Sequence, residues 1–330
     1  VTTDCASFGT PVLFPPEYRF FRRIEPENNM LRLGLDIGGT KIEAQLLDEQ
    51  GQCLLRQRIP TPNQHYADFL SGVTALITQY RFEFKQPFSV GIGLPGAVSP
   101  DTGRIKNSNI LILNGEDLRA DLEQQLNQPV ALANDADCFA LSEAVDGAGK
   151  EGKTVFGAIL GTGCGGGVVV NKQLLSGPNA IAGEWGHNSL PGYQQEKDGL
   201  SQPCYCGRSN CLERFVSGTG FASRFNQQHS TQLDSAQIMA AKQEGDVRAE
   251  LHYQHLLDAL GRSLASVINL IDPHVIVLGG GLSNVASLYQ DLPAAVLPYV
   301  FSDHCNTQIV KARHGDSSGV RGAAWLPGMS

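Results

Sequence analysis

Short apolar runs typical of buried strands alternate with segments of helical spacing along most of the chain. Strands are predicted over 31–37, 41–47, 51–59, 89–94, 130–133, 155–160, 168–171 and 274–278. Helices are predicted over 66–80, 117–126, 136–145, 235–243, 247–270 and 321–326. In the first of them Phe69, Val73 and Ile77 repeat at helical intervals. Strands that alternate with helices predict an α/β architecture.

One layout of strand, glycine-rich turn, strand and turn occurs twice, over 31–51 and over 155–171. We interpret this as a weak internal duplication, with coincidence as the alternative. Two halves with similar beginnings predict two domains that face each other across a cleft. Clefts between domains are common binding sites for small ligands.

The glycine-rich run at 34–41 combines residues that suit a nucleotide. Gly38 and Gly39 let a ligand approach the main chain, Thr40 offers a hydroxyl, and Asp36 is suited to hold a metal ion through water. These groups are what the phosphates of a magnesium-bound nucleotide need, although a Gly-Gly pair is also typical of a simple hairpin turn. Further glycine-rich runs at 161–167 and 279–281 favour the nucleotide.

Composition narrows the class of protein. The chain has 330 residues, of which 42% are hydrophobic and 18% charged, as in a soluble globular protein. Its net charge of −8 disfavours nonspecific binding of nucleic acid, and no stretch approaches the roughly 20 apolar residues that span a membrane. No signal peptide is visible, so we expect a cytoplasmic protein. Residues 1–30, rich in proline and aromatic residues, are expected to be an extension, with Met30 as an alternative start.

Three of the eight cysteines, Cys204, Cys206 and Cys211, form a tight C-x-C-x4-C cluster. Tetrahedral zinc needs a fourth ligand, and His187 is the nearest good candidate. A closed four-ligand site of this kind is structural. Free thiols or a labile disulfide are the alternatives.

Carboxylates near this cluster and at one strand end are candidates for binding a sugar or for catalysis on it. Glu184 and Glu213 suit recognition of sugar hydroxyls, because a carboxylate accepts several hydrogen bonds, although a solvated surface would explain them equally well. Asp135 follows a predicted strand and is suited to take a proton from a sugar hydroxyl, with Asn134 orienting the same sugar. The alternative is that both residues cap the following helix.

Together these motifs resemble the ROK family of bacterial sugar kinases and repressors. The matching segments are LDIGGTKI (35–42), GIGLPG (91–96), NDADCFALSEA (134–144), GTGCGGG (161–167), GEWGH (183–187), CYCGRSNCLE (204–213), DPHVIVLGGGLSN (272–284) and RHGDSSGVRGAA (313–324). The resemblance covers 31–326 and implies a two-domain α/β fold of the hexokinase–actin (ribonuclease H-like) type with an interdomain cleft. It implies a small domain over 31–145, joined by the last helix (about 314–330), and a large domain with the zinc loop over 146–313.

The resemblance also implies an activity, which is ATP-dependent phosphorylation of the 6-hydroxyl of N-acetyl-D-glucosamine. Asp135 resembles the general base, and Gly96, Asn109, Asn134, Asp135, Glu184, His187 and Glu213 resemble ligands of the sugar. Contacts of ATP are implied for Gly34, Leu35, Asp36, Ile37, Gly38, Gly39, Thr40, Lys41, Gly161, Thr162, Gly163, Cys164, Gly165, Gly166, Gly167, Val168, Gly279, Gly280 and Gly281. His187, Cys204, Cys206 and Cys211 resemble the zinc ligands. The expected cofactors are ATP, Mg²⁺ and structural Zn²⁺, and a homodimer is common among similar proteins.

Other activities remain as alternatives. A kinase for N-acetylmannosamine, glucose or another hexose fits the same motifs, but segment 107–115 lacks the Gly-Trp often seen in glucose-specific relatives. A sugar-responsive transcriptional regulator would need a DNA-binding domain, and residues 1–30 are too short, proline-rich and not basic enough for one. A noncatalytic sugar sensor is disfavoured by the intact 34–41 run and Asp135.

Overall fold

A computed structural model describes residues 30–328 of the chain. The expected N-terminal extension, with the aromatic residues that we expected to pack on the main body or on a second subunit, therefore lies outside the described residues except for Met30. Over 30–328, no helix is long and apolar enough to span a bilayer.

Two five-stranded sheets form the body of the molecule, and their topology is the same. The first consists of β1 (Leu31–Ile37), β2 (Lys41–Leu47), β3 (Cys53–Pro60), β4 (Phe88–Leu94) and β7 (Val130–Asn134), in the order β3-β2-β1-β4-β7. The second consists of β8 (Thr154–Leu160), β9 (Cys164–Val170), β10 (Gln173–Leu174), β11 (Val275–Gly279) and β12 (Gln308–Lys311), in the order β10-β9-β8-β11-β12. In each sheet the first two strands and the central strand, β1 or β8, pair antiparallel. The central strand and the last two strands pair parallel. The repeated layout predicted from 31–51 and 155–171 thus extends to the whole of both sheets.

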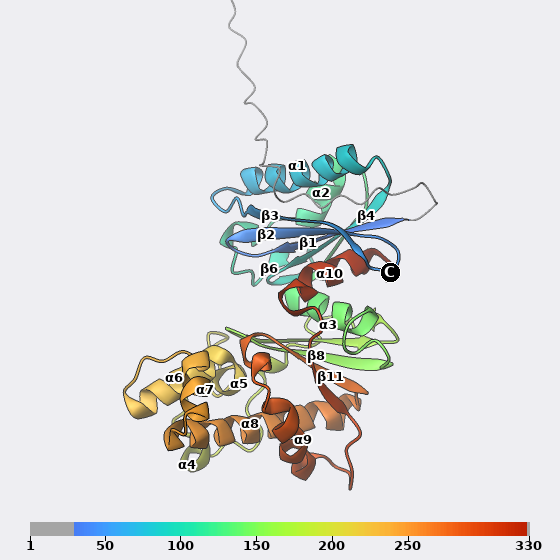
Figure 1. The fold of residues 1–330 in the computed structure, drawn as a ribbon. Coiled ribbons are helices and arrows are strands. Elements are labelled where there is room, and N and C mark those ends of the chain that lie inside the picture. The colour runs from blue at the N-terminus through green and yellow to red at the C-terminus, as the bar shows by residue number, and fades with distance from the viewer. Residues whose placement is uncertain (1–29, 329–330) are drawn as a thin grey trace, which may run out of the picture.

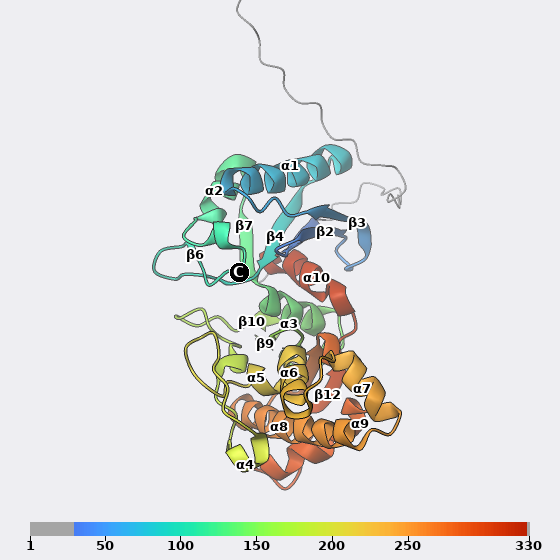
Figure 2. The same ribbon diagram turned by 90° about the vertical axis from the view of Figure 1, so that its left-hand side faces the viewer.

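Helices cover the outer face of each sheet and also fill the space between the sheets (Figure 1). Those of the first half are α1 (Tyr66–Phe84) and α2 (Leu118–Leu126), and a small ribbon of β5 (Ala97–Val98) and β6 (Ile105–Lys106) lies beside them. Those of the second half are α4 (Gln195–Asp198), α5 (Glu213–Val216), α6 (Gly218–His229), α7 (Ser235–Gln243), α8 (Val247–Ile271) and α9 (Leu288–Val296). The middle layer consists of α3 (Asp135–Val145) and α10 (Ser318–Trp325), which both views place between the two sheets (Figure 2).

Each outer layer has its own apolar core. In the first half, Phe69 and Ile77 of α1 are buried with Leu33 of β1 and Ile92 of β4. The helical spacing that predicted α1 is therefore the spacing of its sheet-facing side. In the second half, a separate cluster joins Phe156 of β8 and Leu278 of β11 to the long helix α8.

The middle layer packs main chain against main chain, because glycine occurs at the points of contact. A Cβ atom added to Gly34 of β1 would lie 2.1 Å from the carbonyl oxygen of Val320 in α10. A Cβ on Gly322 of α10 would lie 1.7 Å from the carbonyl oxygen of Cys138 in α3. No side chain fits at either point, so these two glycines determine how closely α10 approaches β1 and α3.

The two middle helices each cover the sheet of the opposite half. Helix α3 follows β7 of the first sheet but packs on β8 and β9 of the second, whereas α10 follows β12 of the second sheet and packs on β1 and β4 of the first. The domain boundary predicted between residues 145 and 146 stays a prediction. It would place α3 in one domain and the sheet on which α3 packs, that of β8 and β9, in the other.

The second glycine-rich run differs from its prediction. We expected a turn over 161–167 and a strand from 168, but strand β9 already begins at Cys164. Glycine here serves packing, because a Cβ on Gly167 would lie 2.8 Å from the Cβ of Ala140 in α3. Helices α6 and α9 and strand β12 were not predicted.

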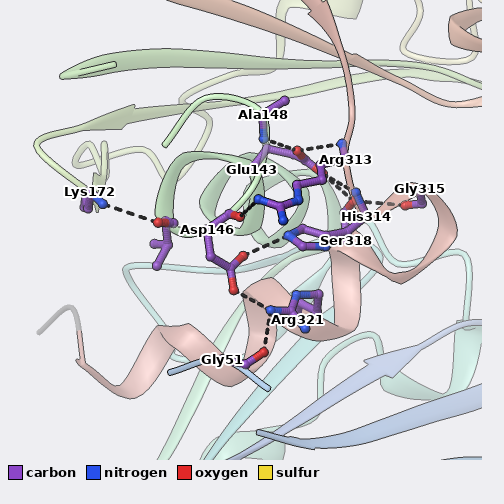
Figure 3. A network of polar contacts seen from close by, with 11 residues as sticks. Gly51, Glu143, Asp146, Ala148, Lys172, Arg313, His314, Gly315, Ser318 and Arg321 are labelled. Atoms are coloured by element: carbon purple, nitrogen blue, oxygen red, sulfur yellow. Dashed lines mark hydrogen bonds and ion pairs between the residues drawn. The ribbon is translucent and has the colours of Figure 1, made fainter. Parts of the chain in front are cut away.

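The two connections between the halves meet at Glu143, whose side chain is fully buried near the end of α3. Its Oε2 accepts hydrogen bonds from the main-chain N–H groups of Ala148 and Arg313, both at 2.9 Å. Its Oε1 accepts from the N–H of His314 at 3.1 Å and from the Ser318 hydroxyl at 2.8 Å (Figure 3). Residues 146–153 and 312–317 are the connections, so one carboxylate holds both of them.

Candidate active site

A cavity of about 360 Å³ opens between the two halves, at the carboxyl ends of the parallel strands. It is lined by Asp36, Ile37, Gly38, Gly39, Pro95, Asn109, Asp135, Phe139, Ile159, Gly279, Gly280, Ser283, Asn284, Lys311, Ala312, Gly315 and Gly319. Strand ends that face a crevice are the usual place for ligands in α/β folds. The structure thus brings the first and third glycine-rich runs to one cavity with Asp135.

The first glycine-rich loop connects β1 to β2 and is held by its own main chain and by two side chains. The N–H of Gly38 donates to the carbonyl oxygen of Lys41 at 2.9 Å, and the hydroxyl of Thr61 donates to the carbonyl oxygen of Gly38 at 2.6 Å. Asn63 donates to the carbonyl oxygen of Gly39 at 3.1 Å. The loop is therefore braced on its carbonyl side before a ligand binds.

Two of the predicted nucleotide ligands at the beginning of this run lie away from the cavity. Gly34 and Leu35 are buried within β1, and Gly34 contacts α10. Thr40 and Lys41 are exposed beyond the turn, outside the lining of the 360 Å³ cavity.

The second glycine-rich run is divided between a loop and a strand. Gly161 and Thr162 line a neighbouring open cavity of about 830 Å³ with Gly281 and with the beginning of α6. The N–H of Gly218, the first residue of α6, donates to the carbonyl oxygen of Gly161 at 2.7 Å. The rest of the run lies outside the lining of both cavities, namely Gly163, Cys164, Gly165, Gly166, Gly167 and Val168.

Asp135 and Asn134 stand at the junction of β7 and α3, and the side chains of both accept a hydrogen bond from the helix. The cap of the helix is Asn134, whose Oδ1 accepts from the N–H of Ala136 at 2.8 Å and whose amide donates to the carbonyl oxygen of Gly96 at 2.9 Å. Asp135 is the first helical residue, and its Oδ1 also accepts from the N–H of Ala136 at 2.8 Å. Its carboxyl group lines the cavity.

Burial and neighbouring acidic groups raise the pKa values of two carboxyl groups that line the cavity, Asp135 and Asp36. Burial between the cleft walls, and then the charge of Glu184, raise the pKa of Asp135, whereas the Ala136 N–H lowers it. Burial, and then the charge of Asp135, raise the pKa of Asp36 to about 6. The charge of Asp135 disfavours the ionised form of Asp36, and a cation in the cleft would favour both carboxylates.

Two polar residues of this region were missed. Lys311, at the end of β12, is the one basic side chain among the described residues that line the 360 Å³ cavity. Lys311 was not predicted as a site residue, because strand β12 was not predicted. Asp137, in the first turn of α3, has a buried Oδ1 without a hydrogen-bond partner. Burial, followed by the charges of Glu184 and Asp135, raises its pKa to about 7.

The four predicted zinc ligands come together. One ligand atom from each of His187, Cys204, Cys206 and Cys211 lies within 4.8 Å of the others. His187 Nδ1 is 3.6 Å from Cys204 Sγ, and Cys206 Sγ is 3.5 Å from Cys211 Sγ. A tetrahedron with zinc–sulfur bonds of about 2.3 Å has edges of about 3.8 Å, so the donor atoms fit a zinc ion.

The cluster holds the loop that carries the candidate sugar ligands. Glu213, the first residue of α5, accepts a hydrogen bond from the N–H of Cys164 at 3.0 Å, which ties the loop to β9. Glu184 is exposed, and its charge reaches both Asp135 and Asp137. The outward nitrogen of His187, Nε2, lies 2.9 Å from the hydroxyl of Tyr205, a residue that sequence reasoning passed over.

Of the predicted sugar ligands, Asn109 and Asp135 line the 360 Å³ cavity, whereas Glu184, His187 and Glu213 lie outside its lining. Gly96, at a φ of +95°, contacts Asn134 through its carbonyl oxygen. A more enclosed cavity of about 320 Å³ lies between α4, α6 and α8, and none of the predicted site residues lines it.

Two sheets of equal topology, a cleft between them, and glycine-rich loops beside a carboxylate define the hexokinase–actin type of sugar kinase fold, as expected. The chain belongs to the ROK family, whose sequence profile matches residues 32–328. It is 40% identical over 296 residues to the N-acetyl-D-glucosamine kinase of Vibrio cholerae, covering 89% of this chain and 98% of that protein. The ROK hexokinase of Thermus thermophilus superimposes with a TM-score of 0.80 at 29% identity, covering 90% of this chain and 97% of the other. A ROK glucokinase of Streptomyces griseus, solved with glucose and AMPPNP, gives 0.69 at 27% identity, covering 90% and 98%.

Proposed function

We propose that the protein transfers the terminal phosphoryl group of ATP to the 6-hydroxyl of N-acetyl-D-glucosamine. The observation that carries the proposal is the position of Asp135, which lines one cavity together with the glycine loop after β1 and the glycine run after β11. A proton acceptor and main-chain donors for phosphate oxygens are thereby available on the two sides of one cleft. The name of the relative in Vibrio cholerae supports the choice of sugar.

In this reaction Asp135 accepts the proton of the attacking hydroxyl. Phosphoryl transfer needs little covalent catalysis by the protein, so the protein acts mainly by positioning the two substrates and by neutralising charge. The main-chain N–H groups around Gly39 and Gly280 suit phosphate oxygens, and the loop that contains Gly161 and Thr162 suits the rest of the nucleotide. Mg²⁺ bound to the nucleotide supplies positive charge in a cleft that contains Asp36 and Asp135.

The sugar is held from the other side of the cleft. Glu184, His187 and Glu213 suit its hydroxyl groups, with Asn109 nearer the cavity and with Asn134 and Gly96 behind Asp135. His187 and the three cysteines would hold a zinc ion, and the closed site would fix the conformation of the loop that carries these residues. Closure of the two halves then excludes water, which competes with the sugar as acceptor. A cytoplasmic location and a homodimer stay predictions.

An assay of ADP release tests the proposal. The protein is incubated with ATP, Mg²⁺ and one sugar at a time, namely N-acetylglucosamine, N-acetylmannosamine, glucose or fructose. We expect the highest kcat/KM with N-acetylglucosamine and, by ³¹P NMR of the product, a phosphate on the 6-oxygen. No sugar-dependent release of ADP would refute the kinase, and a higher kcat/KM with another sugar would refute the choice of substrate.

A further inference from the structure

The acidic groups of the 360 Å³ cavity do not by themselves suit the nucleotide of the proposed reaction. Asp36 and Asp135 line this cavity, and both are negative when ionised. A triphosphate with one Mg²⁺ still has a net negative charge, and the glycine loops offer main-chain dipoles but no full positive charge. Over residues 30–328, the lining contains a single positively charged side chain, that of Lys311.

The second sheet places Lys311 beside the third glycine-rich run. Lys311 is the last residue of β12, the edge strand of this sheet. It pairs with Leu278 of β11 in parallel register, and the N–H of Ala312 donates to the carbonyl oxygen of Leu278 at 2.9 Å. The glycine run begins at the next residue of β11, Gly279. Lys311 and this run therefore stand together at the carboxyl ends of two neighbouring strands, where the cavity opens.

The ammonium group of Lys311 is available to a ligand. It makes no hydrogen bond or ion pair with another residue that the structure describes, whereas Lys197 and Lys242 are paired with carboxylates of α8. The lysine expected from the first glycine-rich run, Lys41, is exposed outside the lining of the cavity. An ammonium group has three donors on a flexible stem and binds phosphate as a compact charge, so Lys311 has the chemistry that was expected of Lys41.

We propose that Lys311 is a phosphate ligand, whose ammonium group donates hydrogen bonds to oxygens of the phosphate chain of the nucleotide. A positive charge in the cavity offsets the repulsion that Asp36 and Asp135 exert on the phosphates. The inference rests on the proposed function and names the side chain that supplies positive charge to its nucleotide site. If Lys311 only projects into water at the mouth of the cavity, its replacement will not change the binding of the nucleotide.

The substitution Lys311→Gln tests the inference, because it removes the charge and keeps most of the length of the side chain. We expect the calorimetric Kd of Mg-ADP to rise about tenfold, since a hydrogen bond to a charged group is lost. The KM for ATP rises by a similar factor, and the KM for the sugar does not change. Adenosine has no phosphate, so its Kd stays that of the wild type. The difference in Kd of Mg-ADP narrows at high salt, which screens the attraction of an exposed cation.

Two further variants show whether the charge is the cause. Lys311→Arg keeps a positive donor at this position and should retain most of the affinity for Mg-ADP. Lys153→Gln is the matched control, because Lys153 is an exposed lysine directly before β8, at the opposite end of the parallel strands of the same sheet. This control should change none of the constants.

The outcomes separate the inference from the function on which it rests. A wild-type protein that binds Mg-ADP but does not phosphorylate N-acetylglucosamine refutes the proposed function, and the binding experiment still decides the role of Lys311. An unchanged Kd of Mg-ADP in Lys311→Gln overturns the inference alone. An equal loss for adenosine also overturns it, because such a loss would reflect the shape of the cavity and not its charge. A wild-type protein that does not bind Mg-ADP overturns both.

Discussion

Replacement of Glu143 by glutamine should weaken the junction between the two halves of the protein. In the native chain its two carboxylate oxygens accept four hydrogen bonds, three from main-chain N–H groups and one from the Ser318 hydroxyl (Figure 3). Glutamine keeps the shape of the side chain but turns one acceptor oxygen into a donor. Its amide nitrogen fits best towards Ser318 and His314, because a hydroxyl is able to rotate and accept, whereas Ala148 and Arg313 offer only N–H donors.

The size of the effect follows from these four contacts. A hydrogen bond to a charged acceptor contributes about 1.5–3 kcal/mol. Glutamine leaves the N–H of His314 facing another donor and weakens the other three bonds by removing the charge, so we expect a loss of about 3 kcal/mol. With an unfolding entropy of about 2.1 cal/mol/K per residue over 330 residues, this loss lowers Tm by about 4–5 °C.

Thermal unfolding followed by circular dichroism measures the shift. Ser318→Ala removes one of the four bonds and should lower Tm by less than half as much. Glu151→Gln is the matched control, because it makes the same change on a side chain that is 90% exposed, and its Tm should stay within about 1 °C of the wild type. A Glu143→Gln protein that unfolds at the temperature of this control would refute the view that Glu143 joins the two connections.

Three further substitutions test other parts of the site. Asp135→Asn should lower kcat by roughly 10²–10⁴-fold and leave calorimetric binding of the sugar intact, and an unchanged kcat would exclude Asp135 as the base. Cys206→Ser should lower the zinc content and weaken binding of the sugar before that of the nucleotide; native protein without zinc by metal analysis would contradict this. Asp137→Asn should raise Tm at pH 8, because the folded state raises the pKa of Asp137 from 3.8 to about 7 and ionisation above that pKa disfavours folding. The gain should shrink as the pH falls from 7 towards 4, and a gain independent of pH would show that the charge is not its cause.

Elements with a strong local pattern were predictable from the sequence. Strands β1 and β2 and helix α7 have the bounds that the pattern of apolar residues predicted. The beginning of β9 was not predictable in this way, because Cys164–Gly167 has the composition of a turn. Helix α3 packs directly on this segment, and its closeness leaves no room for a side chain at Gly167, which is why glycine occupies a strand there.

The candidate site shows the same division. The spacing of three cysteines was enough to predict a metal cluster, and the structure brings His187 to it from 17 residues before Cys204. Local sequence could not separate a cap from a base at 134 and 135, since both residues suit a helix beginning. In the structure Asn134 is the N-cap and its amide also donates to Gly96, whereas the Asp135 carboxyl group accepts from the N–H of Ala136 and lines the cavity.

Sequence alone predicted the class of fold, the family and the residues of the candidate site, because strand and helix periodicity and short motifs are properties of neighbouring residues. The tertiary structure decided how the two halves are joined, since α3 and α10 each cover the sheet of the opposite half. It also decided which members of the motifs meet. Gly38, Asp135, Gly280 and Lys311 share one cavity only because two separately formed sheets present their strand ends to the same cleft, a relation that no local pattern encodes.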